Sequence, residues 1–235
     1  MSPNAIARLA AYCHIHDKPR VPTRAEQMVK KEQQQSWRSV RDALIKSHPF
    51  TGHLVRFLDP VPVIDSRLPT LLTDGRHLFI NSHFAAHLPT RDSRFLLAHA
   101  AYHCIGGHFL PVGEKDIHRW NLACDHAVNY LAILERIDIP PEAVLYPSQA
   151  GCSPLAVYEW LARHPCPTHD RPLDIHQQDV VDTNRTATVI DPDFSPLPPS
   201  ASRAHAWCEM ALEHAEQRQR INSNVRNYLA VLAKK

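Results

Sequence analysis

Two histidines four residues apart are the side chains in this 235-residue chain best placed to bind a metal ion. His99 and His103 lie in an apolar run, and on a helix residues i and i+4 share one face. Neutral imidazole is the commonest metal ligand in proteins, and histidine makes up 17 of the 235 residues. The spacing therefore indicates a metal-binding pair, with two packed core histidines as the alternative.

The residue after His99 decides what chemistry such a pair could support. In the zincin motif H-E-x-x-H this residue is a glutamate, which acts as a general base and does not bind the metal. Ala100 occupies the position here. Losing a positioned base costs about 10²- to 10⁴-fold in rate. The chain as written is therefore expected to be nearly inactive, either as a natural pseudopeptidase or as an engineered variant.

A zinc site of this type also needs a third ligand. Asn121, Asp125 and Asn129 form an i, i+4, i+8 polar row on an otherwise apolar segment, which is costly to bury without partners. A metal-binding Asp125 flanked by two orienting amides would explain the row, and a partly exposed polar stripe is the alternative. His108 is a minor candidate, because it falls one residue short of the spacing that metzincins use.

Helices must position these side chains. Apolar periodicity and end signals predict long helices at 24–47, 92–106, 115–134 and 153–162, and one closing amphipathic helix at 201–235. Thr23 and Glu26 form a capping-box pattern at the first of them, and Ser153 is the expected cap of the fourth. The run from Leu54 to Ile64 is expected to form one or two short edge strands, since it contains two prolines. Asp74-Gly75 between apolar runs predicts a β-hairpin.

The two polar motifs together resemble a bacterial family of predicted metallopeptidase domains, which often precede a von Willebrand factor A-like domain. The resemblance rests on the H-x-x-x-H helix and on a W-N-x-A-x-D-x-x-x-N signature, which this chain matches from Trp120 to Asn129. It implies a minimal zincin-like domain with Zn²⁺ bound by His99, His103 and Asp125. Trp120, Asn121 and Asn129 would then support the ligands from outside.

The expected fold class is α+β and mostly helical, with a small edge sheet or hairpin packed on the metal-binding helix. The predicted organisation is an irregular segment at 1–22, a zincin-like metallopeptidase core at 23–163, a Pro/Asp-rich loop or lid at 164–200, and the C-terminal helix at 201–235. The lid stretch carries six aspartates between residues 170 and 195.

Composition limits the location and the class of function that remain possible. The sequence has no stretch of the roughly 20 apolar residues that cross a membrane and no export signal, which favours a cytoplasmic protein. The leading interpretation is a zinc-dependent endopeptidase acting on a protein or peptide substrate, and the family resemblance implies an AAA-type ATPase partner. A non-catalytic metal-binding interaction module is the first alternative. A nucleic-acid-associated factor is the second, but a net charge of only +2 does not favour it.

Overall fold

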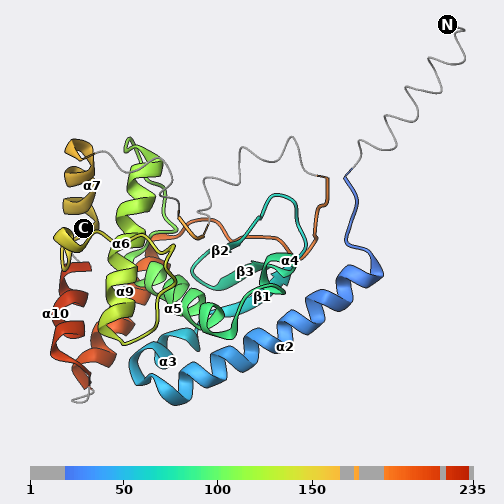
Figure 1. Cartoon of the computed structure of the whole chain (residues 1–235), viewed down its shortest axis with the longest axis horizontal. Helices are drawn as coiled ribbons and strands as arrows, with labels where there is room; N and C mark the ends of the chain where they lie inside the picture. Colours follow the sequence, from blue (N-terminus) through green and yellow to red (C-terminus); the bar gives the residue numbers. More distant parts are fainter. Residues whose placement is uncertain (1–18, 165–171, 175–187, 218–220, 233–235) are drawn as a thin grey trace, which may run out of the picture.

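The computed structural model describes residues 19–164, 172–174, 188–217 and 221–232. In this part the chain forms a mostly helical α+β fold, in which helices and a small sheet surround one central helix (Figure 1). The predicted fold class is therefore confirmed. Most of the predicted irregular segment at 1–22 lies outside the described residues.

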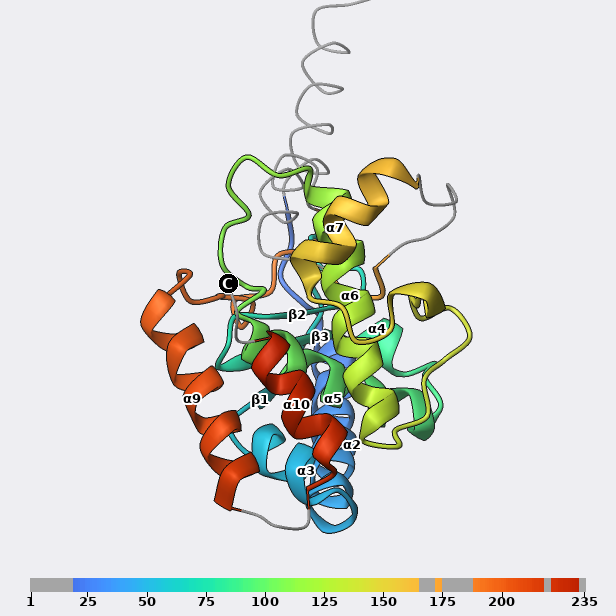
Figure 2. The same cartoon turned by 90° about the vertical axis from the view of Figure 1, so that its left-hand side faces the viewer.

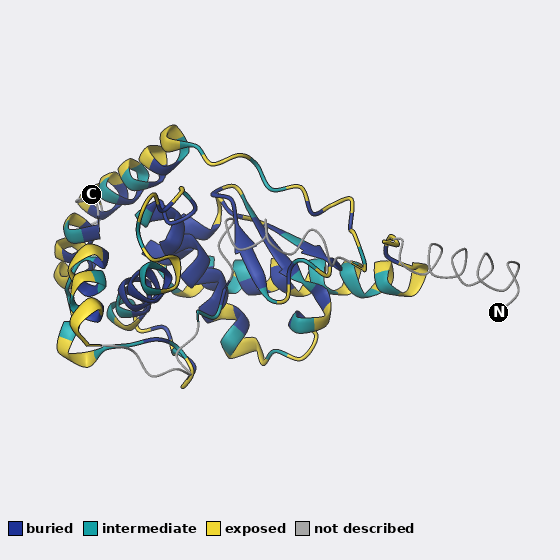
Figure 3. Ribbon diagram, turned by 90° about the horizontal axis from the view of Figure 1, so that it is seen from above, coloured by how far each residue is buried: buried dark blue, intermediate teal, exposed yellow. Residues whose placement is uncertain are grey.

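The central helix is α5 (Thr90–Gly106), which carries the two histidines. Every residue from Phe95 to Ile105 is buried, and a helix that is apolar all round must lie inside the molecule. It packs against α2 (Arg24–Ser47), α6 (Ile117–Leu134) and α9 (Ala201–Gln217). Figure 3 shows that burial is concentrated in the inner helices and in the sheet; α5 and α6 are mostly buried, whereas α2 and α9 bury only one face. Gly107, with φ of 65°, ends α5 in the left-handed conformation typical of a helix C-terminus.

Helix α2 runs along one side of the molecule (Figure 1) and begins as the sequence predicts. The Thr23 side chain accepts a hydrogen bond from the Glu26 backbone N–H, and the Glu26 carboxylate accepts one from the Thr23 backbone N–H. This reciprocal pair confirms the capping box. The inner face of the helix buries Trp37, Val40 and Leu44.

Three short strands form the sheet in the order β1-β3-β2: β1 (Asp59–Val63), β2 (Leu71–Thr73) and β3 (His77–Asn81). Strands β2 and β3 are antiparallel and joined through Asp74 and Gly75, so the predicted hairpin is confirmed. Gly75 has φ of +83°, which explains the need for glycine in the turn. Strand β1 pairs with β3 in parallel at the edge of the sheet, where its two prolines are tolerated.

Two predictions about elements are wrong. The residues Leu54 and Val55 end a helix, α3 (Pro49–Val55), and do not begin a strand; Pro49 starts this helix at a position that suits proline. The single helix predicted at 201–235 is two helices, α9 and α10 (Ser223–Leu232) (Figure 2). The Oδ1 atom of Asn222 accepts the Asn224 backbone N–H, and both helices bury apolar faces against the core. Packing thus favours two short helices.

The remaining helices are short or peripheral. Helix α4 (Ser82–Ala85) follows the sheet, and α7 (Pro154–Arg163) packs on α6 with Ser153 as its cap, as predicted. No helix in the described ranges is long and apolar enough to span a membrane.

Residues 188–200 form an extended segment, here called the strap. It begins beside the start of α2, where the Ile190 backbone N–H donates to the Arg20 carbonyl oxygen, and runs past the sheet to the start of α9. Asp191 lies at its buried centre, where its carboxylate accepts hydrogen bonds from Lys30 Nζ (2.8 Å) and the Ile64 backbone N–H (2.8 Å). The Asp191 backbone N–H in turn donates to Asp65 (2.8 Å). This described part of the predicted 164–200 loop is therefore anchored by buried polar contacts.

Candidate metal centre

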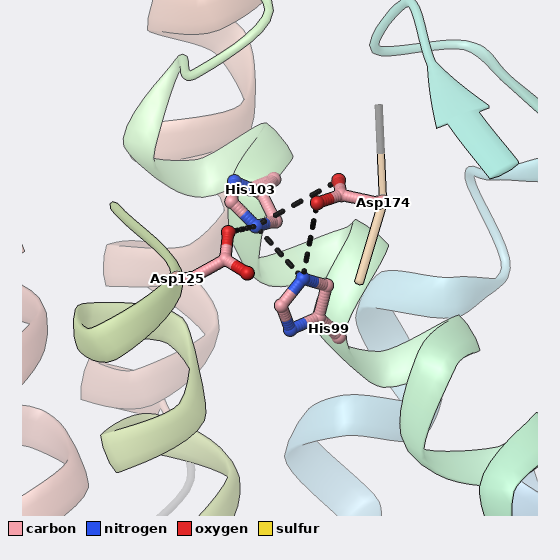
Figure 4. Close-up of side chains that lie close together, drawn as sticks. All are labelled: His99, His103, Asp125 and Asp174. Carbon is pink, nitrogen blue, oxygen red and sulfur yellow. Dashed lines mark hydrogen bonds and ion pairs between the residues drawn. The ribbon is translucent and has the colours of Figure 1, made fainter. Parts of the chain in front are cut away.

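Four side chains with metal-ligating atoms meet between α5 and α6. His99 and His103 project from α5, Asp125 from α6, and Asp174 from the described segment 172–174 (Figure 4). One ligand atom from each lies within 4.8 Å of the others. None of the four residues is more than 6% exposed. The structure thus brings together the three residues that the sequence singles out as ligands and adds a fourth, Asp174.

The separations between the donor atoms fit one small cation. The Nε2 atoms of His99 and His103 lie 2.9 Å apart, and His103 Nε2 lies 3.4 Å from Asp125 Oδ1. Asp174 lies 3.6 Å from His99 Nε2 and 3.9 Å from His103 Nε2. Ligand atoms about 2.0 Å from a tetrahedral Zn²⁺ are about 3.3 Å apart. The donor set therefore has the chemistry and the spacing of a site for one divalent cation.

Asn129 fixes which nitrogen of His99 faces the other ligands. Its Nδ2 donates to the Val144 carbonyl oxygen (2.9 Å), so its Oδ1 is oriented to accept the His99 Nδ1–H (2.8 Å). The proton on Nδ1 leaves Nε2 with a lone pair directed into the cluster. This amide therefore selects the tautomer of His99 that can bind a metal through Nε2.

His108 contacts the cluster from outside. Its Nδ1 lies 2.9 Å from Nδ1 of His103, and its ring packs across the end of α5. It is not among the four residues whose donor atoms converge. A methyl group at Gly106 would collide with the His108 ring, so a residue without a side chain is required there. His108 is placed to orient His103, much as Asn129 orients His99.

The electrostatics of the cluster also suit a cation. Burial disfavours the protonated form of His99, but the carboxylates of Asp174 and Asp125 outweigh burial and raise the pKa of this histidine. Two buried carboxylates beside two neutral imidazoles carry a net negative charge, which is costly in the interior. A divalent cation bound by all four side chains would balance it.

The other residues singled out by the sequence occupy the surroundings of the cluster. Ala100 is fully buried among apolar core side chains. Trp120 packs edge-on against His108, with ring centroids 6.5 Å apart. The buried Oδ1 atom of Asn121 has no hydrogen-bond partner among the described residues, so this amide, unlike Asn129, receives no orienting bond through its oxygen from them. Cys104 and Cys124 are buried, and burial raises the pKa of the Cys104 thiol to about 12, which makes it a poor ligand or nucleophile.

Sequence comparison places these features in a known class. The model of the family described as "Putative metallopeptidase domain" matches residues 30–162, which is more than half of the chain. The chain therefore belongs to this metallopeptidase-domain family. The matched region contains α5 and α6, with both histidines and Asp125, and it ends before Asp174. No curated protein and no solved structure matches the chain.

Proposed function

We propose that this chain binds one Zn²⁺ ion through His99, His103, Asp125 and Asp174, and that it does not hydrolyse peptide bonds in its present form. Membership of the metallopeptidase family and the convergence of four buried donors support the metal site. In an active enzyme of this class, the ion supplies Lewis-acid chemistry at a peptide carbonyl.

The position of Asp174 is the observation that carries the proposal. Structural zinc sites have four protein ligands, whereas catalytic sites have three and keep one position open. Asp174 is buried and lies within 4 Å of the Nε2 atoms of both histidines, where it would complete the coordination sphere. A centre with two histidines and two aspartates is closed to substrate.

Ala100 supports the same conclusion independently. A methyl group can neither accept nor donate a proton, so the residue that serves as general base in H-E-x-x-H is missing. Its full burial in the apolar core also means that a glutamate side chain at this position would displace packed neighbours. We therefore expect Ala100→Glu alone not to produce a peptidase.

Zinc-dependent peptide hydrolysis is the second candidate function, and family membership favours it. It requires an open coordination position and a base. The double variant Ala100→Glu/Asp174→Ala supplies both, whereas each single variant supplies one. Cleavage of an unfolded protein substrate by the Ala100→Glu single variant, with Asp174 intact, would contradict the closed centre.

Metal content is the direct test of the proposed function. The purified chain should contain about one zinc per molecule by mass spectrometry, and His99→Ala and Asp125→Ala should lose it. Asp174→Ala should keep zinc with weaker affinity, because three ligands remain. His118→Ala is the matched control, since this histidine is exposed at the start of α6. A wild-type chain that takes up no zinc would overturn the proposal.

A further inference from the structure

A pocket of about 230 Å³ lies beyond the metal centre, at the C-terminal end of α5 and the N-terminal end of α7. His108, whose ring also contacts His103, forms part of its wall. Any occupant would therefore lie one side chain away from the proposed metal ligands.

The walls of the pocket are largely apolar. Leu110, Val112, Trp120 and Leu155 line it together with His108. A buried apolar cavity of about 150 Å³ is known to hold a benzene molecule. The pocket is thus large enough for one leucine- or phenylalanine-sized side chain, but small for a long acyl chain.

Among the described residues, the lining carries one cation and no acidic side chain. The Lys115 Nζ atom lies 4.8 Å from the centroid of the Trp120 ring, and this lysine forms no salt bridge within the described part of the chain. These lining residues therefore attract an anionic group. An ammonium group would find no carboxylate among them to balance its charge.

We propose that this pocket binds the C-terminal apolar residue of a peptide or protein, with its side chain between the apolar walls and its carboxylate beside Lys115. A chain terminus carries an apolar side chain and a carboxylate on the same carbon atom, which matches a pocket whose apolar walls include one lysine beside Trp120. An internal residue lacks the charge, and a free amino acid carries an ammonium group as well. This proposal adds a class of ligand to the proposed function, and binding of this ligand does not require a bound metal.

The test uses N-acetyl-leucine, its uncharged analogue N-acetyl-leucinamide, and free leucine. Binding is followed by NMR through the indole N–H signal of Trp120, identified among the four tryptophans with Trp120→Phe. N-acetyl-leucine should bind about tenfold more tightly than the other two, as one charge-assisted hydrogen bond implies. Lys115→Met should reduce its affinity to that of the amide, and Leu155→Asp should weaken all three. Lys31→Met, an exposed lysine on α2, is the matched control.

Equal affinities for N-acetyl-leucine and N-acetyl-leucinamide would overturn the proposal. Tight binding of free leucine would also overturn it, as would a Lys115→Met variant whose affinity for N-acetyl-leucine is unchanged. Absence of any shift at high ligand concentration in the folded protein would also overturn it. The titrations are made with zinc-loaded and chelator-treated protein. Binding without zinc uptake would refute the metal site alone, and zinc uptake without binding would refute the pocket alone.

Discussion

Asn129 determines which ring nitrogen of His99 is available to a metal, because its Oδ1 accepts the Nδ1 proton. Removing such an orienting partner typically costs 10- to 100-fold in metal affinity. We expect Asn129→Ala to weaken zinc binding by about this factor, measured by competition with a chromophoric chelator.

Asn121→Ala is the matched comparison, since Asn121 is a buried amide on the same helix whose Oδ1 accepts no hydrogen bond from the described part of the chain. It should weaken zinc binding much less. Equal losses in the two variants would mean that Asn129 acts through general packing and not through the tautomer of His99.

His126 gives the fold a defined response to pH. Its Nδ1 accepts the Tyr146 backbone N–H (3.0 Å), and its Nε2 donates to the Gln149 carbonyl oxygen (3.0 Å), so the ring is held in its neutral form. Burial lowers the pKa of His126 below the ordinary value near 6.5, although the Gln149 contact opposes this shift. The unfolded chain therefore takes up a proton at higher pH than the folded chain does.

The resulting stability is present above about pH 6.5 and is lost as the pH falls from there through the lowered pKa. Urea unfolding between pH 5 and 8 should show a flatter pH dependence for His126→Gln than for the wild-type chain, because the variant lacks the contribution of His126 while that of His48, whose pKa burial also lowers, remains in both. Parallel curves would exclude His126 as the source.

At the scale of single residues, the sequence identifies most of the candidate metal site. His99, His103 and Asp125 could be predicted because their i, i+4 spacing and the polar row on an apolar helix are local patterns. Asp174 could not, since it is one of six aspartates between residues 170 and 195 and no local pattern distinguishes it. Only the three-dimensional path of the chain brings it to the histidines.

At the scale of elements, the end of α5 illustrates two opposing effects at one glycine. In a helix, glycine is less favourable than alanine by about 0.5–1 kcal/mol, so Gly106→Ala would ordinarily stabilise the protein. Here the added methyl group collides with the His108 ring, which is buried and contacts His103. We expect the collision to dominate and Gly106→Ala to lower the free energy of unfolding by about 1–3 kcal/mol.

Denaturant unfolding and zinc affinity measured on the same variant check this prediction. His108→Ala combined with Gly106→Ala should recover part of the loss, because the obstructing ring is gone. Stabilisation by Gly106→Ala alone would show that His108 moves aside without cost.

Element boundaries could be predicted where a cap or a turn is encoded locally. The Thr23–Glu26 capping box and the Asp74-Gly75 turn are such cases, and both are confirmed. The short helix at 49–55 and the break between α9 and α10 were not predicted. Both features depend on which apolar helix faces pack against the core, and local sequence preferences do not determine this packing.

At the scale of the whole molecule, the Lys30–Asp191 ion pair holds the strap, which lies late in the sequence, against α2, which lies early in it. The Asp191 carboxylate is almost fully buried, and Lys30 is its cationic partner. Within the described part of the chain, Lys30→Met would leave this charge with only the backbone N–H donors of Ile64 and Asp193. We expect a loss of about 2 kcal/mol in the free energy of unfolding, with Lys31→Met near zero. Urea unfolding of the two variants measures the difference, and equal stabilities would show that the strap contributes little.

The origin of the four donors has a consequence for which metal the protein retains. His99, His103 and Asp125 come from consecutive helices, whereas Asp174 follows later in the chain, outside the family-matched region. If the site binds an ion as proposed, a nascent chain that ends before residue 174 supplies only three of the donors and leaves one coordination position open. The later arrival of Asp174 would close that position and slow the exchange of the bound ion. The metal found in the purified protein would then depend on supply during synthesis as well as on affinity.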